Sequence, residues 1–321
     1  GLGDVYKRQE QSMKKIAGVG ACVYDTLAVV EKYPAEDTKI KAEKTVVSGG
    51  GPVATGRVAA AKLGADCAYL GALAADAAGD YLMSDFNRYG VSTEFIERAD
   101  GVSFTSTILL SLASNTRTCV FDRGTVSNYP LTEKQRKAVA QADVLMVDGN
   151  NLESAIEAAE IAVKHGVKVL YDAGGLYEGV ERLLPYSDYL IPSIEFALKI
   201  TKTESVEKAA EILFERYSPR AVVITMGDKG GLIYDGKNAE RYPAFNVKAV
   251  DTNGAGDVFH GAFAFFLSMG LKPDECARYS SAVSALKCTV TGARAGSPDL
   301  TLLKEFLLSR GEDVKPLEKT Q

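Results

Sequence analysis

The sequence predicts an α/β fold in which a mainly parallel sheet is covered by helices on both faces and carries a small β lid. Three observations lead to this prediction. Short apolar runs alternate with longer amphipathic runs through the middle of the chain, two β-prone stretches lie earlier, and the last third is mostly helical. Strands that alternate with helices at this spacing form βαβ units, which build a parallel sheet.

The strands of the expected sheet are short apolar runs of the kind that is buried on both faces. Amphipathic stretches of helical length separate them. The expected strands are residues 16–20, 144–148, 167–172, 189–191 and 221–225, and the expected helices are residues 152–165, a short helix before residue 189, and residues 206–217, 255–269, 273–288 and 300–309.

The lid is expected from residues 21–47 and 102–122, which are rich in Thr and Val and have no helix between their strands. Small antiparallel pieces of this kind suggest a flap over one edge of the sheet. Residues 1–12 read as a non-native or disordered extension, because Met13 and two lysines lead directly into the first apolar run. No long linker rich in Pro, Gly or Ser follows, so residues 13–315 are expected to form a single domain.

Composition narrows the class of protein. The net charge of -5 gives no basic footprint, so nucleic acid is not an expected partner. No apolar run approaches the roughly 20 residues that span a bilayer, and no secretory signal is visible, so no membrane partner is expected. The five cysteines are scattered and odd in number, which favours a reducing cytoplasm over disulfides or a zinc site.

The most informative motif is the segment 251–257, Asp-Thr-Asn-Gly-Ala-Gly-Asp, which leads into an apolar helix. Its small residues, Gly254, Ala255 and Gly256, let backbone N–H groups converge on an anion, and the helix start adds the positive end of its dipole. A carboxylate at Asp257 would repel phosphate, so it needs another role. Asp257 either takes a proton from an attacking hydroxyl or caps a buried helix, and the segment alone leaves both readings open.

Two further glycine-rich turns stand beside expected helices and strands. Residues 48–52, Ser-Gly-Gly-Gly-Pro, open a helix that runs to about residue 63, and residues 225–231 follow a buried strand. Each allows close backbone approach to a ligand, but each also fits an ordinary tight turn. A phosphate loop of the Gly-x-x-x-x-Gly-Lys type is missing, and Val23 stands where a dinucleotide-binding turn needs its third glycine.

Several charged side chains near these motifs have two readings each. Asp148 and Asp172 end buried-type strands, where they either contact a ligand or cap the next loop. His260 lies one helical turn after Asp257 and either sets the electrostatics of the site or bonds to a neighbour on the helix. Arg123 is either a lid cation that reaches an anionic substrate or a solvated hairpin arginine, and Lys229 either steers phosphates or belongs to a turn.

Taken in this order, the segments 50–64, 225–230 and 251–257 resemble the PfkB/ribokinase family of sugar and nucleoside kinases. The resemblance covers the chain from Met13 to about Pro298, and the Asp-Thr-x-Gly-Ala-Gly-Asp signature is highly specific. Within the family the likeness is closest to the sulfofructose kinase-like subgroup, through residues 49–52, 285–289 and 292–296. The resemblance implies a ribokinase-like fold with a lid that closes over the sugar.

The resemblance also implies a role for each motif. Asp257 would deprotonate the sugar hydroxyl, and the amides of Gly254, Ala255 and Gly256 would form the anion hole for the γ-phosphate of ATP. The implied cofactors are ATP and Mg²⁺, with a potassium ion near Asp251 and Gly292. The implied sugar contacts are Asp25, Lys39, Gly50, Gly51, Thr55 and Arg123, and the implied nucleotide contacts are Thr225, Gly227, Gly230, Asn253 and Cys288.

The chain departs from the family pattern at two of these places. Thr55 stands where the family often has Asn, which alters one sugar contact. Residues 193–196, Ser-Ile-Glu-Phe, keep the carboxylate of a magnesium motif one position early, at Glu195. Magnesium is therefore expected to be held mainly by phosphates and water, with Glu195 acting through water.

The substrate is expected to be a small sugar. Lys39 falls where the subgroup has a sulfonate-binding lysine, but Asp122 and Asn150 occupy the other two positions. An acidic residue beside a sulfonate is unfavourable unless Arg123 compensates, so a neutral or differently charged sugar is favoured. The sequence predicts ATP-dependent phosphorylation of a primary hydroxyl, on a ketose or its derivative. The family resemblance also implies that two copies can pair as a homodimer through the lid. A nucleoside kinase and a non-catalytic sugar- or nucleotide-binding relative are the alternatives.

Overall fold

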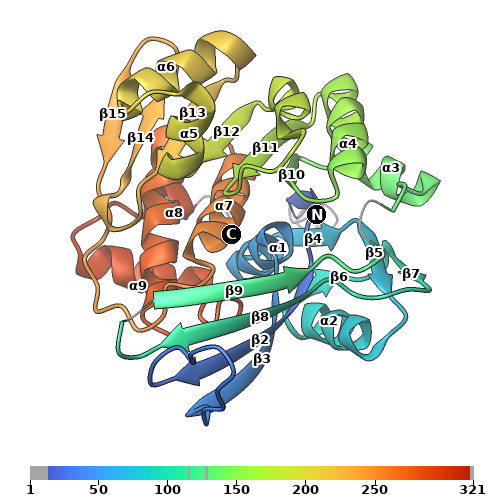
Figure 1. The fold of residues 1–321 in the computed structure, drawn as a ribbon. Helices are drawn as coiled ribbons and strands as arrows, with labels where there is room; N and C mark the ends of the chain where they lie inside the picture. The colour runs from blue at the N-terminus through green and yellow to red at the C-terminus, as the bar shows by residue number, and fades with distance from the viewer. Residues whose placement is uncertain (1–13, 115, 127–128, 319–321) are drawn as a thin grey trace, which may run out of the picture.

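A nine-stranded, mainly parallel sheet forms the body of the molecule and confirms the expected α/β class (Figure 1). The computed structural model describes residues 14–114, 116–126 and 129–318, so the extension expected over residues 1–12 lies outside the described part. The two pairings that involve β14 are antiparallel, and the other neighbours run parallel. In spatial order the strands are β15 (Ala239–Tyr242), β14 (Gly231–Tyr234), β13 (Ala221–Thr225), β12 (Tyr189–Pro192), β11 (Lys168–Ala173), β10 (Val144–Asp148), β1 (Lys15–Val19), β4 (Asp66–Tyr69) and β6 (Val91–Ser92).

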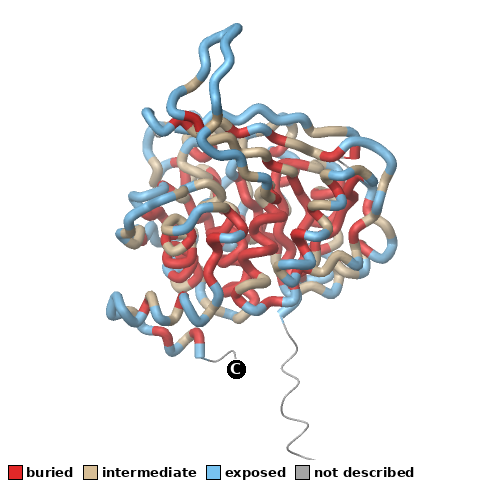
Figure 2. Tube along the Cα trace, turned by 90° about the horizontal axis from the view of Figure 1, so that it is seen from below, coloured by how far each residue is buried: buried red, intermediate tan, exposed pale blue. Residues whose placement is uncertain are grey.

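Helices cover both faces of this sheet, and each face has its own hydrophobic core. The buried centre runs through the sheet, and exposed segments surround it (Figure 2). One face carries α1 (Pro52–Leu63), α7 (Ala255–Ser268), α8 (Pro273–Cys288) and α9 (Leu300–Ser309), and the other carries α3 (Glu133–Ala140), α4 (Leu152–His165), α5 (Ile194–Thr201) and α6 (Val206–Tyr217).

A separate four-stranded sheet forms the lid and confirms both β-prone stretches. It crosses the lower part of the view in Figure 1. Its strands, in spatial order, are β3 (Lys44–Gly50), β2 (Val23–Val30), β8 (Thr105–Ser111) and β9 (Thr116–Asp122). Beside it lie α2 (Ala77–Arg88) and the short parallel pair β5 (Gly71–Ala74) and β7 (Ile96–Ala99).

Most of the expected elements appear at the expected residues, but the short helix expected before residue 189 is wrong. Two 3-10 turns, Val180–Arg182 and Leu184–Tyr186, take its place. Pro185 lacks the amide donor that an α-helix would need in its interior, and Gly179 has a left-handed conformation just before the first turn. Gly179 and Pro185 therefore lie too close together for a regular α-helix to form between them.

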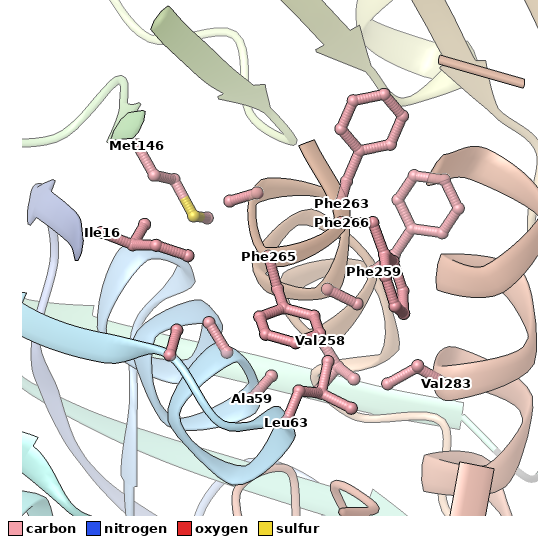
Figure 3. Packing of buried hydrophobic residues seen from close by; sticks show 14 of the residues in the cluster. Ile16, Ala59, Leu63, Met146, Val258, Phe259, Phe263, Phe265, Phe266 and Val283 are labelled. Atoms are coloured by element: carbon pink, nitrogen blue, oxygen red, sulfur yellow. The ribbon is translucent and has the colours of Figure 1, made fainter. Parts of the chain in front are cut away.

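The crossing of α1 and α7 positions the 251–257 segment against the body. Figure 3 shows Ala59 and Leu63 of α1 and Val258 of α7 among the side chains of one buried apolar cluster. The two backbones come so close that a Cβ added to Gly261 would lie 2.1 Å from the carbonyl oxygen of Gly56. Glycine at this crossing therefore lets α7 start next to the strand ends of the sheet.

Candidate active site

The segment 251–257 folds as a tight turn followed by the first turn of α7. Gly254 is the residue before the helix, so Ala255, Gly256 and Asp257 are its first three residues. The amides at a helix start have no partner within the helix, which leaves them available to an anion. One of them is partly engaged, because Ala255 donates to the carbonyl oxygen of Thr252 at 3.2 Å.

Asp257 has the electrostatics expected of a base that works near neutral pH. Burial, together with the carboxylates of Asp172, Asp148 and Asp25, raises the pKa of its carboxyl group to about 7, against the opposing effect of His260. A base is most effective when its pKa lies near the working pH. The position before α7 is occupied by Gly254, and no side-chain hydrogen bond caps this helix.

The two strand-end carboxylates have different surroundings. Asp148 accepts backbone N–H groups from Ala21 at 3.0 Å, Val53 at 3.2 Å and Asn150 at 2.8 Å. These bonds fix the start of α1 against β10, which is the capping role left open by the sequence. Asp172 accepts only one such bond in the described part of the chain, from Gly174 at 3.1 Å, and its other oxygen faces His260.

A second group of residues lies on the lid side of the site. The buried carboxylate of Asp25, on β2, accepts a 2.6 Å hydrogen bond from the Ser106 hydroxyl on β8. A Cβ at Gly50 would lie 1.9 Å from the other oxygen of Asp25, so position 50 has room only for glycine. Arg294 donates to the carbonyl oxygen of Gly50 at 2.7 Å and to Asp85 at 2.6 Å. These bonds hold the base of the lid against the body.

Arg123 joins the lid to the body at the end of β9. Its guanidinium donates to the Asn150 side chain at 2.6 Å. It also lies over the rings of Phe104, Phe121 and Tyr177, with centroid distances of 5.7, 5.6 and 5.2 Å. The solvated hairpin arginine considered for the sequence is therefore wrong, because this guanidinium lies in an aromatic cage.

The structure does not bring every expected sugar contact together. Thr55 is fully buried, and its hydroxyl has no hydrogen-bond partner among the described residues, so it offers no open contact. Lys39 is exposed on the loop between β2 and β3. Gly51 precedes α1 with a φ of 90° and accepts the amide of Thr55, as an ordinary helix start does.

A cleft of about 490 Å³ lies beside the anion-hole turn. Its wall includes four of the five expected nucleotide contacts. The fifth, Asn253, does not line the cleft, but its neighbour Thr252 does, and the backbone N–H of Asn253 donates to the Asp251 carboxylate at 2.8 Å. Gly256 and Ala255 line the same cleft, so its inner end opens on the start of α7. The four expected contacts that line it are Thr225, Gly227, Gly230 and Cys288.

The position expected to hold potassium already has a cation of the chain beside it. The fully buried Lys287 donates from Nζ to the carbonyl oxygen of Asp251 at 2.6 Å and lies 3.7 Å from its Oδ2. That carboxylate oxygen also accepts the amide of Gly292 at 2.7 Å. The residues around Asp251 therefore fit an internal ammonium group better than a potassium ion.

The described residues around this site contain no preformed metal-binding cluster. Across residues 14–114, 116–126 and 129–318, no group of three or more His, Cys, Asp or Glu side chains is arranged to hold a metal ion. Glu195 is exposed in the first turn of α5. No helix in the same described ranges is long and apolar enough to cross a membrane.

Sequence reasoning missed several residues that the structure places here. Ser106 and Tyr177 carry no motif, and their contacts with Asp25 and Arg123 join distant parts of the chain. Arg294 lies in the 292–296 segment that contributed to the family resemblance, but no role was assigned to it. Its full burial beside Asp85 is visible only in three dimensions.

The mainly parallel sheet, covered by helices on both faces, and the cleft beside the start of α7 define a class of protein, a nucleotide-dependent kinase. The sequence model of the family described as "pfkB family carbohydrate kinase" matches residues 13–300, and the chain belongs to this family. It is a PfkB-type sugar kinase with a ribokinase-like fold.

Its relatives have names of the same kind. Ribokinase from Haemophilus influenzae is 27% identical over 302 residues, which cover 92% of this chain and 98% of that protein. Deoxyribokinase from Salmonella typhi is 25% identical over 302 residues, covering 91% and 98%. The solved structure of Arabidopsis thaliana ribokinase complexed with ribose and ATP has a TM-score of 0.83 at 23% identity and covers 92% and 99%; at this identity it shows the shared fold.

Proposed function

We propose that this protein transfers the γ-phosphate of ATP to a primary hydroxyl of a small sugar, a ketose or a ketose derivative, with Asp257 as the base. The observation that carries the proposal is the position of Asp257. Its carboxyl group, with a pKa raised to about 7 by burial, lies in the first turn of α7, and the residue before it lines the cleft.

The chemistry follows from this placement. Asp257 removes the proton of the sugar hydroxyl as that oxygen attacks the γ-phosphorus and the bond to the β-phosphate oxygen breaks. The amides of Gly254, Ala255 and Gly256 stabilise the charge on the transferred group, which is what phosphoryl transfer chiefly needs. Closure of the lid over the sugar excludes water, which would otherwise accept the phosphate.

ATP fits the cleft because its walls combine glycine turns with an apolar end. Thr225, Gly227 and Gly230 would follow the phosphates and ribose, and Cys288 would lie near the base. Mg²⁺, held mainly by phosphate oxygens and water, neutralises phosphate charge when bound, and Glu195 would reach it through water. The potassium ion expected near Asp251 and Gly292 is not part of the proposal, since Lys287 already contacts Asp251.

The sugar would lie between the lid and Asp257. Asp25, Gly50 and Gly51 are its proposed polar contacts. Lys39 would contact the sugar only if the loop between β2 and β3 folded inward. Thr55 would need to move before it could contribute. Arg123 is proposed to read an anionic or strongly polar end of the sugar, because its guanidinium is oriented by Asn150 and three rings.

Other acceptors compete with a ketose. The relatives' names point to ribose and deoxyribose, and the fold also occurs in a nucleoside kinase from Burkholderia thailandensis. A nucleoside would need room for its base beside the aromatic rings around Arg123. Pairing of two copies through the lid is a further part of the proposal, supported by the exposed Val120 and Phe121 on β9, which are 70% and 53% exposed.

An acceptor screen tests the proposal. Purified protein, ATP and Mg²⁺ are incubated with ketoses, aldoses, sugar acids and nucleosides, and ADP formation is followed for each. A ketose is expected to give the highest kcat/KM. A preference for ribose or a nucleoside would refute the ketose assignment, and ATP consumption that no acceptor stimulates would refute the kinase assignment. Arg123→Ala, tested on the best acceptor, should raise KM for anionic more than for neutral sugars.

A further inference from the structure

His260 is a buried side chain of α7 for which the proposed phosphoryl transfer has no role. Only 3% of its surface is exposed. Its Nδ1 lies 2.6 Å from the carbonyl oxygen of Gly256, and its Nε2 lies 2.9 Å from the carbonyl oxygen of Ile191 at the end of β12. Both ring nitrogens therefore face an oxygen that can only accept a hydrogen bond.

A neutral imidazole does not fit these surroundings. It carries one N–H donor and one bare nitrogen lone pair, whichever tautomer is present. One of the two carbonyl oxygens would then face a nitrogen lone pair at hydrogen-bond distance inside the core, and the two lone pairs would repel each other. An imidazolium ring has two donors and satisfies both oxygens.

Asp172 supplies the matching negative charge. Its Oδ2 lies 3.2 Å from Nδ1 of His260 and has no hydrogen-bond partner among the described residues. Burial holds the pKa of His260 below its usual value, although the two carbonyl contacts and the carboxylates of Asp257 and Asp148 act in the opposite direction. Burial and the neighbouring Asp148 likewise raise the pKa of Asp172, so each charge in this pair depends on its contact with the other. A buried carboxylate and a buried imidazolium in contact cost less than either charge alone.

We propose that His260 is an imidazolium ion that positions and polarises the peptide group between Gly256 and Asp257, with Asp172 as its counter-ion. The carbonyl of Gly256 and the amide N–H of Asp257 belong to one planar peptide group. A cation on the carbonyl oxygen makes that N–H a stronger donor toward an anion at the start of α7. The contact with Ile191 ties the same ring to the sheet, so this peptide group, which follows directly on the proposed anion-hole amides, keeps its orientation.

The positive ring also acts on the base. Three carboxylates raise the pKa of Asp257, from Asp172 on β11, Asp148 on β10 and Asp25 on β2, whereas His260 lowers it. Loss of the cation would leave those three negative charges unopposed. The kinetic part of this inference rests on the proposed function, but the charge of the ring does not.

The charge state can be measured without any substrate. The chain has two histidines, so nitrogen-15 NMR of the ring nitrogens in tag-free protein gives two separate sets of signals. At about pH 8, where an ordinary histidine is neutral, His260 is expected to show both ring nitrogens protonated. A neutral ring at His260 overturns the proposal, whether or not the protein phosphorylates any sugar.

Kinetics of His260→Asn test the positioning role. The expected result is a fall in kcat of about tenfold or more with little change in either KM, because the interaction acts mainly in the transition state. The acid limb of the pH profile should move to higher pH. His165→Asn is the matched control, since His165 also contacts the carbonyl four residues before it, Ile161, at 2.9 Å, but on the surface of α4. A His260→Asn profile with an unmoved acid limb would overturn the positioning role.

Discussion

The pH dependence of phosphorylation is the prediction that depends most directly on the surroundings of Asp257. Burial and three nearby carboxylates raise the pKa of this carboxyl group from 3.8 to about 7, so it gains a proton as the pH falls through neutrality. Only the ionised form can accept the proton of the sugar hydroxyl. The rate should therefore be highest above the pKa and fall as the solution becomes more acidic.

The size of the fall follows from the titration of a single group. At about pH 6, one unit below the pKa, roughly one-tenth of the molecules hold an ionised base, so kcat/KM for the sugar should fall by about tenfold from its plateau near pH 8. An ordinary aspartate would stay ionised over the whole of this range.

A coupled ADP assay at saturating ATP and Mg²⁺ measures the profile, with the coupling enzymes in excess at each pH. Saturating nucleotide keeps the protonation of free ATP from limiting the rate. A profile that stays flat down to about pH 5 would refute the reasoning, because it would place the pKa of the base near that of an exposed carboxyl.

Three further predictions concern single positions. Gly50→Ala places a Cβ 1.9 Å from Asp25, and should lower kcat/KM for the sugar by roughly 10- to 100-fold while ATP binding, followed by calorimetry, stays unchanged. In Gly261→Ala the added Cβ clashes with the Gly56 carbonyl oxygen, and overpacking of this kind, which costs about 1–3 kcal/mol, should lower Tm by several degrees. An unchanged Tm would contradict the close approach of the α1 and α7 backbones at this position. Exchange of potassium for sodium should leave the rate unchanged because Lys287 contacts Asp251, and clear activation by potassium would show that this contact does not replace the ion.

The fold could be predicted largely from hydrophobic patterning. The buried strands β10 and β13 and the amphipathic helices α4 and α6 have the predicted bounds, since each is an unbroken run of one periodicity. The helices α3 and α5 were missed because each has only eight residues. The helix α2 was also missed, although its 12 residues match the length of α6. Even so, α3 begins with a capping box formed by Thr132 and Gln135, which is a signal that the sequence contains.

The site was predictable only where its chemistry is local. The anion-hole turn and Asp257 are seven consecutive residues, and they carry their own signature. The bond from Ser106 to Asp25 and the bond from Arg294 to Gly50 span 81 and 244 residues, and no periodicity in a single sequence connects such positions. For His260, the contact with Gly256 lies four residues back on the same helix and agrees with the helix-neighbour interpretation of the sequence, whereas the contact with Ile191 spans 69 residues.

The measurement that tests the central claim most directly is the turnover of Asp257→Asn on the best acceptor, beside its ATP affinity and its Tm. Turnover is expected to fall by several orders of magnitude while ATP still binds. The Tm at about pH 8 should be equal or higher, because a carboxyl whose pKa is raised by folding makes the folded state less stable as the pH rises above its unfolded pKa. Sugar phosphorylation by Asp257→Asn at a rate close to that of the unchanged protein would contradict the assignment of Asp257 as the base.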